Sequence, residues 1–557
     1  MEKLTEFQKQ VLEECIKKGS GGLSLNMGQG KTFIGLSLGA IFNTGNGKSI
    51  VVVSKNLIVN WVFELKKFFG DSLKYLVFHQ DNIKNLNTFA YDMDAQIVIV
   101  TPEVLAKFYK KYNIESEFIE TKMVFNGIFD IPNNQYSKVK KCLLKQFDGS
   151  LGSALFSKEW ASIIIDEGQN HTNILTTKCQ AICSVHTKHR WVMSGTLFNE
   201  PKTERILGYY CMINHNTFPR TMSDVKKFIT SAEFKGINKT LVYREPTAAT
   251  NKNGIVKFEQ HIITHQLSNK EEIIYISMNK ILKDIQAKMQ MYKSARDTEN
   301  MRKYSTYLLA MLTYLRQSTV CPMIVFAKCS LDMIDMENKS HLSNMIYKEL
   351  NELGLERYLN DPESIKSSRI KAVLDQIDKH PNDNITVFSC FRTSIDILRE
   401  FVPKDRKTIS IDGSMSIKAR EKAIDEFKTK NANSKGNVLF LTYDIGAEGL
   451  NLQESNTVML LDMYWNDGKS KQAIARVLRN GQNDKVNIYI FTSNTGVEKA
   501  VLGKQDEKLD MIKEMNIGAI KTTIKKIKVE EIIRMIDIYD CVSSLSKKFV
   551  RGSASTT

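Results

Sequence analysis

The sequence is poor in the residue types that mark secreted, membrane-bound or low-complexity proteins. Only 9 of its 557 residues are cysteine and only 9 are proline. So few cysteines argue against a disulfide framework and favour reduced thiols inside a cell, and so few prolines argue against proline-rich linkers. No apolar run approaches the roughly 18 residues that cross a bilayer, and the N-terminal segment lacks the apolar core of a secretory signal. We expect neither a membrane span nor export.

The overall composition indicates a folded chain with an excess of positive charge. Apolar residues make up 42% and charged residues 25%, which is enough to build buried cores. The length allows about three or four domains, or two large ones. The formal net charge of +16 favours a polyanionic partner such as nucleic acid. Charge alone is weak evidence, because the longest basic cluster, at residues 521–528, is modest.

Short β-branched runs alternate with helix-like stretches along most of the chain. Such runs predict buried parallel strands, and they lie at residues 49–54, 96–101, 162–167, 190–196, 384–391, 407–412, 437–442, 457–462 and 486–491. The pattern predicts an α/β fold with two parallel sheets. Between the two groups, apolar residues recur at helical spacing over about 273–370, which predicts helical additions to the second sheet.

A polar connector separates the two predicted sheets. Residues 244–253 are rich in polar residues, and Pro246 and Gly254 act as breakers. We therefore expect one lobe over 1–247, a second lobe over 248–528, and a C-terminal helix and tail over 529–557. The role of that helix is open between bracing the lobes and docking a partner.

The first motif that carries chemistry is a phosphate-binding loop at residues 24–32, SLNMGQGKT, followed by an apolar helical pattern. Its glycines allow backbone N–H groups to close around phosphate oxygens at the positive end of the helix. Lys31 is expected to neutralise the β- and γ-phosphates and Thr32 to bind Mg²⁺. Leu25 occupies the first glycine position of the strict pattern, so the motif alone also fits a glycine-rich turn without function.

The second motif is an acidic pair, Asp166 and Glu167, which follows the apolar run at 163–165. The carboxyl ends of strands are where α/β sheets place ligand chemistry. Asp166 is expected to hold Mg²⁺, and Glu167 to orient and deprotonate the water that attacks the γ-phosphate. An isolated acidic pair is more often a solvated turn, but its occurrence together with the loop favours catalysis.

The third motif lies at residues 472–482, QAIARVLRNGQ. Arg476 and Arg479 are three residues apart, which predicts one helical face. Arginine fingers accelerate phosphoryl transfer by roughly 10³ to 10⁵, so two guanidinium groups supplied by a second lobe would make hydrolysis depend on lobe closure. The alternative is a surface pair, which is common on basic helices.

In this order the motifs resemble those of Swi/Snf-type ATPases, the double-stranded-DNA translocase branch of helicase superfamily two. The resemblance extends over most of the chain. The matching segments are residues 4–8 (adenine-reading Q motif), 24–32 (motif I), 51–68 (Ia), 99–105 (Ib), 166–173 (DEAH box), 194–199 (III), 308–322 (a helical signature of this branch), 387–391 (IV), 411–427 (the segment after motif IV), 441–466 (V) and 472–482 (VI).

The resemblance implies two RecA-like parallel-sheet lobes with helical protrusions, which hydrolyse ATP to ADP and phosphate with Mg²⁺ when duplex DNA is bound. By motif position it implies nucleotide contacts at Gln8, Met27, Gly28, Gln29, Gly30, Lys31 and Thr32. It implies coupling of nucleotide state to DNA movement at Gln169, Ser194, Gly195, Thr196, Gly446 and Gln472. The candidate contacts to DNA phosphates are Lys55, Thr101, Ser389 and Thr442, and a capping or surface role is an equal alternative for each.

The motifs of this chain differ from the usual family sequence at positions that couple nucleotide state to DNA movement. Gly168 and Gln169 replace the usual Ala-His, and Leu197 replaces a proline of motif III. Motif VI differs at Ala475, Leu478 and Asn480. None of these changes removes a group that hydrolysis requires, but a purely regulatory ATPase is an open alternative.

The predicted function is therefore an ATP-driven motor that grips the backbone of double-stranded DNA, including forked DNA or nucleoprotein, without reading its sequence. The alternatives are an RNA- or single-strand-directed helicase of the same superfamily and a non-catalytic DNA-binding scaffold of a transcription complex. The compact Lys- and Asn-rich chain resembles forms carried by large DNA viruses and phages. We expect an intracellular protein of the cytoplasm or nucleus, or one associated with a virus or phage.

One weaker pattern invites a zinc site. Cys179, Cys183, His186 and His189 have offsets of 4, 7 and 10, which also describe one helical face, and a single helix cannot wrap four ligands around an ion. We expect core packing there, and Mg²⁺ as the only metal.

Overall fold

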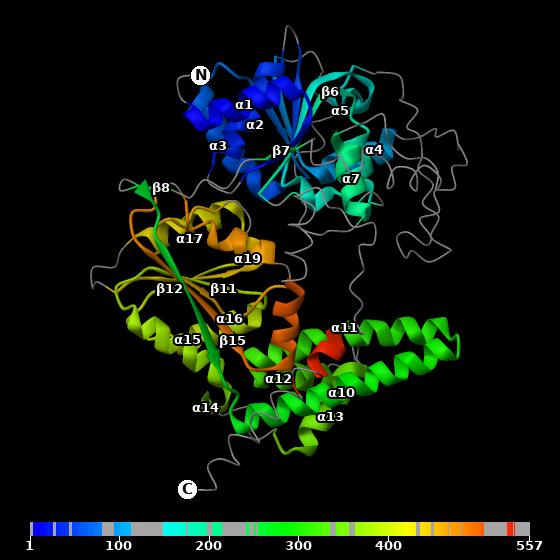
Figure 1. The fold of residues 1–557 in the computed structure, drawn as a ribbon, viewed down its shortest axis with the longest axis vertical. Coiled ribbons are helices and arrows are strands. Elements are labelled where there is room, and N and C mark those ends of the chain that lie inside the picture. Colours follow the sequence, from blue (N-terminus) through cyan, green and yellow to red (C-terminus); the bar gives the residue numbers. More distant parts are fainter. Residues whose placement is uncertain are drawn as a thin grey trace. The chain divides into compact units, whose positions relative to one another are not determined.

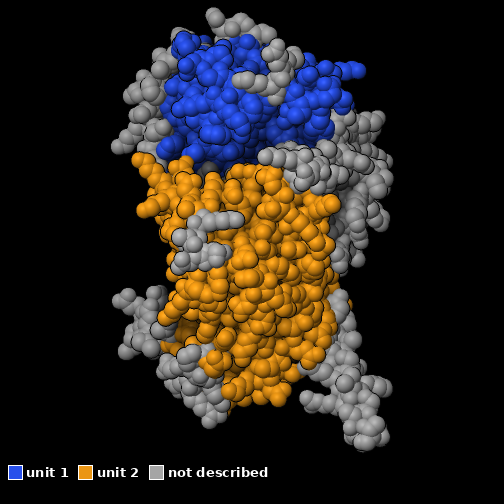
Figure 2. All heavy atoms as spheres, turned by 90° about the vertical axis from the view of Figure 1, so that its left-hand side faces the viewer, with its two compact units in different colours: residues 1–249, 508–526 blue, residues 250–507, 527–557 orange. Residues whose placement is uncertain are grey.

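The computed structural model describes most of the chain. The described residues are 4–25, 29–43, 47–80, 94–112, 149–173, 176–195, 197, 203–213, 241–243, 250–251, 254–334, 341–355, 362–429, 435–446, 450–465, 467–479, 481–505, 532–537 and 540. They form two compact units, one within residues 1–249 and the other within residues 250–507 and 527–557 (Figure 2).

The first unit is built on a parallel sheet (Figure 1). The strand order of this sheet is β3-β4-β2-β5-β6-β1-β7. Its strands are β1 (Gly21–Ser24), β2 (Ser49–Val52), β3 (Tyr75–Phe78), β4 (Ile97–Val100), β5 (Trp160–Asp166), β6 (Thr187–Ser194) and β7 (Leu241–Tyr243). Its helices are α1 (Glu6–Lys18), α2 (Lys31–Phe42), α3 (Ile58–Phe69), α4 (Pro102–Tyr112), α5 (Leu151–Ser157), α6 (Thr177–Cys183) and α7 (Thr203–Ile213), with 3₁₀ turns η1 (Lys55–Leu57) and η3 (Gly168–His171).

Alternate residues of the central strands point to opposite faces of this sheet, and each face has its own core. Ile50 and Val52 pack with residues of α4 to α7, whereas Val51 and Val53 pack with residues of α1, α2 and α3. Because both faces are covered, the central strands consist of continuous apolar runs rather than an alternating pattern. The doubly covered sheet leaves the carboxyl ends of its strands as the natural place for ligand chemistry.

The second unit has a six-stranded parallel sheet with the order β10-β15-β14-β11-β13-β12. Its strands are β10 (Phe258–His265), β11 (Ile385–Ser389), β12 (Thr408–Ile411), β13 (Val438–Thr442), β14 (Thr457–Leu460) and β15 (Val486–Ser493), preceded by a hairpin of β8 (Thr250–Asn251) and β9 (Gly254–Ile255). Its helices are α10 (Asn269–Ser294), α11 (Thr298–Val320), α12 (Pro322–Ile334), α13 (His341–Glu352), α14 (Pro362–Ile365), α15 (Ser368–Lys379), α16 (Arg392–Phe401), α17 (Ile417–Lys428), α18 (Tyr443–Gly446) and α19 (Asp467–Ile474), and residues 496–505 and 532–537 are also helical.

The long helices α10 and α11 form a hairpin that extends from the second unit (Figure 1). Beside them, α15 carries a fully buried arginine, Arg369. Its Nη1 donates to the carbonyls of Leu461 and Phe491 at 2.9 and 3.2 Å, and its Nη2 donates to Glu498 Oε2 at 2.6 Å. A buried charge with this many partners is satisfied in place, so it ties α15 to the ends of two strands.

The predicted α/β class with two parallel sheets and helical protrusions is confirmed. Every predicted strand segment contains an observed strand. The sequence-based prediction missed β1, β3, β7 and β10 of the two sheets, as well as the β8–β9 hairpin. Most of these strands have only two to four residues, and the longer β10 is largely polar. Among the helices of the described ranges, none is long and apolar enough to cross a bilayer.

Candidate active site

The predicted phosphate loop and acidic pair meet at the carboxyl edge of the first sheet. Strand β6 lies between β1 and β5, pairing Ser24 with Ser194 and Asp166 with Met193. Leu25 continues the ladder, because its N–H donates to the Ser194 carbonyl at 3.1 Å. Motifs that are far apart in the sequence are therefore adjacent because their strands are neighbours.

The loop enters α2 through a glycine that no other residue can replace without strain. Gly30 has φ of 81°, and a Cβ atom there would lie 2.2 Å from Gln8 Nε2. Gln8 also donates from Nε2 to the Gln29 carbonyl at 3.3 Å, and its backbone and side chain form a capping box with Thr5 at the start of α1. The structure thus brings together Gln8, Gln29 and Gly30, three of the predicted nucleotide contacts.

Lys31 begins α2 and points its ammonium group toward the acidic pair. Its Nζ lies 3.6 Å from Glu167 Oε1, and its side chain is only 10% exposed. The same Nζ would lie 3.5 Å from a Cβ at Gly195, so the motif III glycine leaves room beside it. Nζ makes no hydrogen bond to any residue in the described ranges. A buried ammonium that lacks hydrogen bonds is costly, which indicates a donor reserved for a ligand.

Asp166 is the last residue of β5, and its carboxylate is held by two donors. The Glu167 backbone N–H donates to Oδ1 at 3.0 Å, and the indole Nε1–H of Trp61 donates to Oδ2 at 2.8 Å. Burial raises the pKa of Asp166 to about 6, the Glu167 charge adds to the rise, and Lys31 opposes it. In the sequence, Trp61 stands out only as part of the motif Ia segment at residues 51–68, and that place was the one signal of a further role.

Glu167 adopts a backbone conformation that is unusual for its residue type. Its φ of 47° lies in the left-handed region, and such strain is typical of functional sites. Gln169 Nε2 donates to Glu167 Oε2 at 2.6 Å, so the predicted coupling residue touches the predicted base. Between them, Gly168 packs so closely on β6 that a Cβ would lie 2.3 Å from Val192 Cγ1. The packing of this turn on β6 therefore explains the glycine at position 168, where the family usually has alanine.

Some predicted site residues lie outside the described residues, namely Met27, Gly28 and Thr196. Thr32 is in the first turn of α2 and is half-buried, and Ser194 is fully buried. The described residues fit a nucleoside triphosphate with Mg²⁺, because they offer a buried ammonium, a buried carboxylate and a helix N-terminus at one edge of the sheet. Asp166 and Thr32 would hold the cation.

In the second unit, the structure brings motif V and motif VI together. Arg476 is buried, and its Nε donates at 3.2 Å to the carbonyl of Gly446, the last residue of α18. A Cβ at Gly446 would lie 2.3 Å from Phe388 Cε1, so this position requires glycine. The expectation of one helical face for Arg476 and Arg479 is wrong, because α19 contains Gln472 but ends at Ile474. Arg476 follows it in a turn, and Arg479 lies beyond that turn outside any regular secondary structure.

The four candidate DNA contacts differ in accessibility. Lys55 is exposed at the start of η1, and Thr442 is half-buried at the end of β13. Thr101 is buried and accepts from the Val104 N–H at 3.3 Å, as a cap of α4 would. Ser389 is buried and donates to Asp462. Phosphate contact stays a prediction for all four. For Ser389 it would require the hydroxyl to leave Asp462, and for Thr101 it would require the buried hydroxyl to become accessible.

The cysteines and histidines of the apparent zinc pattern have separate surroundings. Cys179 and Cys183 are buried in α6, which ends at Cys183, so the pattern does not continue along one helix. His186 is exposed. His189, on β6, stacks on Phe42 at 3.9 Å between ring centroids, and its Nδ1 lies 2.9 Å from the Gly19 carbonyl oxygen.

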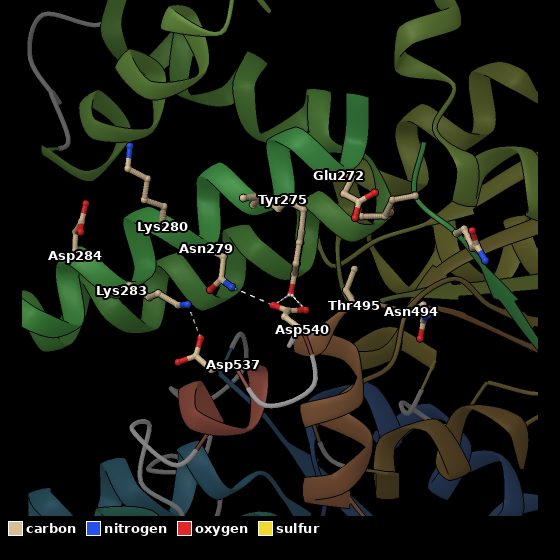
Figure 3. Close-up of a pocket in the computed structure, with 13 residues that line it drawn as sticks. Glu272, Tyr275, Asn279, Lys280, Lys283, Asp284, Asn494, Thr495, Asp537 and Asp540 are labelled. Carbon is tan, nitrogen blue, oxygen red and sulfur yellow. Dashed lines mark hydrogen bonds and ion pairs between the residues drawn. The ribbon is translucent and has the colours of Figure 1, made fainter. Parts of the chain in front are cut away.

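A cavity of about 580 Å³ lies in the second unit beside α10. Asp540 lines it, and Figure 3 shows its carboxylate joined to Tyr275 and Asn279 of α10. Its carboxylate accepts from Gly496 N–H at 2.7 Å, from Asn279 Nδ2 at 3.0 Å and from the Tyr275 hydroxyl at 3.2 Å. Asp540 therefore caps the helix at 496–505 from a distant segment and fixes that segment to α10. This addresses the open role of the C-terminal helix, because Asp537 and Asp540 both contact α10 of the second unit.

We expect Asp540→Ala to loosen the helix at 496–505. Hydrogen bonds to a charged acceptor contribute about 2 kcal/mol, which corresponds to roughly 30-fold faster amide exchange there. Hydrogen–deuterium exchange with mass spectrometry measures this directly. Asp537→Ala is the matched control, because Asp537 pairs with Lys283 at 2.9 Å on the surface and such pairs contribute little. Equal protection in the two variants would contradict the capping role.

Comparisons with known proteins identify the family of the chain. The family model described as "SNF2-related domain" matches residues 8–323, and the "Helicase conserved C-terminal domain" matches residues 368–481. The chain is 27% identical, over 89% of its length and 86% of the other protein, to "Putative helicase 172L" of Invertebrate iridescent virus 6. It is 24% identical over 83% of its length to the "DNA repair and recombination protein RAD54-like" of Drosophila pseudoobscura pseudoobscura, of which it spans only 55%.

Among solved structures, the "Sulfolobus solfataricus SWI2/SNF2 ATPase core in complex with dsDNA" aligns with 96% of this chain and 96% of that chain, at 19% identity and a TM-score of 0.35. The SNF2-related model alone matches more than half of the chain. The chain therefore belongs to the SNF2-related domain family and carries the two domains of a helicase-superfamily ATPase.

Proposed function

We propose that this protein is an ATP-dependent translocase on double-stranded DNA, whose nucleic-acid-dependent hydrolysis of ATP to ADP and phosphate drives movement or the remodelling of protein–DNA complexes. The observation that carries the proposal is the meeting of Lys31, Asp166 and Glu167 at one sheet edge, with the Lys31 ammonium buried and without a hydrogen bond to the described residues. Membership in the SNF2-related family supports the same reaction.

In this proposal the first unit binds the nucleotide. Gly30 and the N-terminus of α2 receive the phosphates, Lys31 donates to them, and Gln8 contacts the base from α1. Asp166 and Thr32 hold Mg²⁺, which supplies positive charge that stabilises the phosphoryl oxygens. When phosphate oxygens bind the Lys31 ammonium group, they replace Glu167 as its ion-pair partner. The Glu167 carboxylate is then available for water.

Glu167 acts as the general base of the reaction. Its carboxylate orients the attacking water and accepts its proton, so the water attacks the γ-phosphate as a better nucleophile. Gln169 donates a hydrogen bond to Glu167 Oε2. Glu167 Oε1 becomes the free acceptor once Lys31 binds phosphate instead. The amide of Gln169 is neutral at every pH, so this contact does not titrate as the family's histidine would.

The second unit supplies the stabilising positive charge. Arg476 and Arg479 reach the γ-phosphate in the state that hydrolyses ATP, and the hydrogen bond from Arg476 to Gly446 links this step to motif V. Gln472, Gly446 and the motif III residues then couple nucleotide state to the DNA contacts. Hydrolysis is therefore expected to need both units of the full chain.

Three observations support double-stranded DNA as the substrate of the motor. The chain carries a net charge of +16. Lys55 is exposed at the beginning of motif Ia. A relative that matches 83% of the chain is named for DNA repair and recombination. Backbone contacts of this kind read no sequence and weaken steeply with salt.

The test is the ATPase rate of the full chain with duplex DNA, forked DNA, single-stranded DNA and RNA, each at two salt concentrations. We expect duplex-containing DNA to stimulate hydrolysis most and the stimulation to fall as salt rises. Greatest stimulation by RNA or single strands would replace the proposal with a helicase directed at those substrates. Absence of hydrolysis with every nucleic acid would instead support a non-catalytic scaffold.

A further inference from the structure

Trp61 is the one aromatic side chain whose polar atom reaches the acidic pair in the described ranges. It lies on α3, is completely buried, and its Nε1 donates to Asp166 Oδ2 at 2.8 Å. The two residues are 105 positions apart in the sequence. A buried tryptophan usually finds an acceptor for its N–H group, but this acceptor is the carboxylate assigned to the cation.

The position of the indole ring is fixed by close packing. A Cβ atom at Gly35 of α2 would lie 2.9 Å from Trp61 Cη2 and 2.9 Å from the Met193 methyl group. The ring therefore occupies a space that only a glycine in the neighbouring helix leaves open. Because the ring cannot shift toward α2, the direction of its N–H bond is set by the packing of α2 against α3.

The donors at Asp166 hold both carboxylate oxygens. The Glu167 backbone N–H fixes Oδ1, and the indole N–H fixes Oδ2. Since two hydrogen bonds on two oxygens restrict rotation about the last side-chain bond, the carboxylate has one orientation. An indole N–H can only donate, so it neither competes for a cation nor accepts the proton of the attacking water.

We propose that Trp61 is a positioning residue, whose indole N–H orients the Asp166 carboxylate for the Mg²⁺ that accompanies the nucleotide. This rests on the proposed function, because it assigns the cation to Asp166. Donors of this kind around a metal ligand change metal affinity by about 10–100-fold when they are removed. Trp61→Phe should therefore weaken the cation site while the phosphate loop stays intact.

The chain offers a matched control in Trp191. It is also completely buried in the first unit, on β6, but its Nε1 makes no hydrogen bond to the described residues. Trp61→Phe and Trp191→Phe thus remove the same atoms from the same kind of environment. Only the first substitution removes a hydrogen bond to Asp166.

The experiment measures Mn²⁺ binding to the full chain in the presence of ADP, with free Mn²⁺ followed by electron paramagnetic resonance. We expect about tenfold weaker Mn²⁺ binding in Trp61→Phe and less than a twofold change in Trp191→Phe. In ATPase assays, the Mg²⁺ concentration at half-maximal rate should rise by the same factor in Trp61→Phe, with the KM for ATP at saturating Mg²⁺ little changed. A merely structural role of Trp61 would change the Mg²⁺ requirement and the KM for ATP together.

Equal Mn²⁺ affinity in the two variants, with a wild type that hydrolyses ATP, would overturn the role of Trp61 and leave the proposed function intact. A wild type that neither hydrolyses ATP nor binds Mn²⁺ with ADP would overturn both. If Trp61→Phe does not fold, Gly35→Ala provides the second variant, because it retains the indole and crowds its ring. Wild-type Mn²⁺ affinity in Gly35→Ala would then overturn the proposal.

Discussion

Replacing Glu167 with glutamine should slow DNA-stimulated ATP hydrolysis by about 10² to 10⁴-fold, the usual contribution of a general base. Glutamine keeps the shape of the side chain and can still accept from Gln169, but it cannot take a proton from water. Nucleotide binding should be retained, because Lys31 and the loop are unchanged and Lys31 loses its ion-pair partner. Steady-state phosphate release and the binding of a fluorescent ATP analogue measure the two effects separately.

Glu159→Gln is the matched control for this variant. Glu159 precedes β5 in the same unit, is exposed, and lies 3.9 Å from Lys188 in a surface ion pair. The same chemical change there should leave hydrolysis within twofold of the wild type, since such pairs contribute little. Near-normal turnover by Glu167→Gln would remove the assignment of the base.

The second large effect is expected in the other unit. Arg479→Ala should lower the ATPase rate by about 10³-fold, the lower end of the range for arginine fingers, with little change in ATP affinity. Arg476→Ala should have at least as large an effect, because it also removes the hydrogen bond to Gly446 and with it a link between motifs V and VI. Single-turnover hydrolysis at saturating ATP measures the loss without a contribution from binding.

Arg399→Ala provides the comparison for the arginine variants. Arg399 is an exposed residue in the last turn of α16 in the same unit, and its removal changes the net charge equally. It should hydrolyse ATP at the wild-type rate. If Arg479→Ala and Arg476→Ala behaved like Arg399→Ala, the proposed contribution of the second unit would be wrong.

The chemistry of the first unit could be predicted because it follows from local sequence and from one property of parallel sheets. Gly30 and Lys31 form a recognisable loop, and Asp166 ends an apolar run. The carboxyl ends of parallel strands share one edge, so two motifs that each follow a strand are expected to meet. The observed distance of 3.6 Å from Lys31 to Glu167 agrees with this expectation.

What could not be predicted depends on contacts between residues far apart in the sequence. The hydrogen bond from Trp61 to Asp166 requires knowledge of how α3 packs on α2. The cap that Asp540 gives to the helix at 496–505 joins residues 44 positions apart and has no local signal. The end of α19 before Arg476 is a boundary error of a few residues, and boundaries are where periodicity is least informative.

The most direct measurement of the central claim is displacement of a third strand from a DNA triplex by the full chain. Wild-type protein with ATP and Mg²⁺ should release the third strand from an otherwise intact duplex, because a motor that tracks the backbone removes whatever lies in its path. Glu167→Gln with ATP should leave the triplex in place. A wild type that hydrolyses ATP on duplex DNA but releases no third strand would contradict translocation.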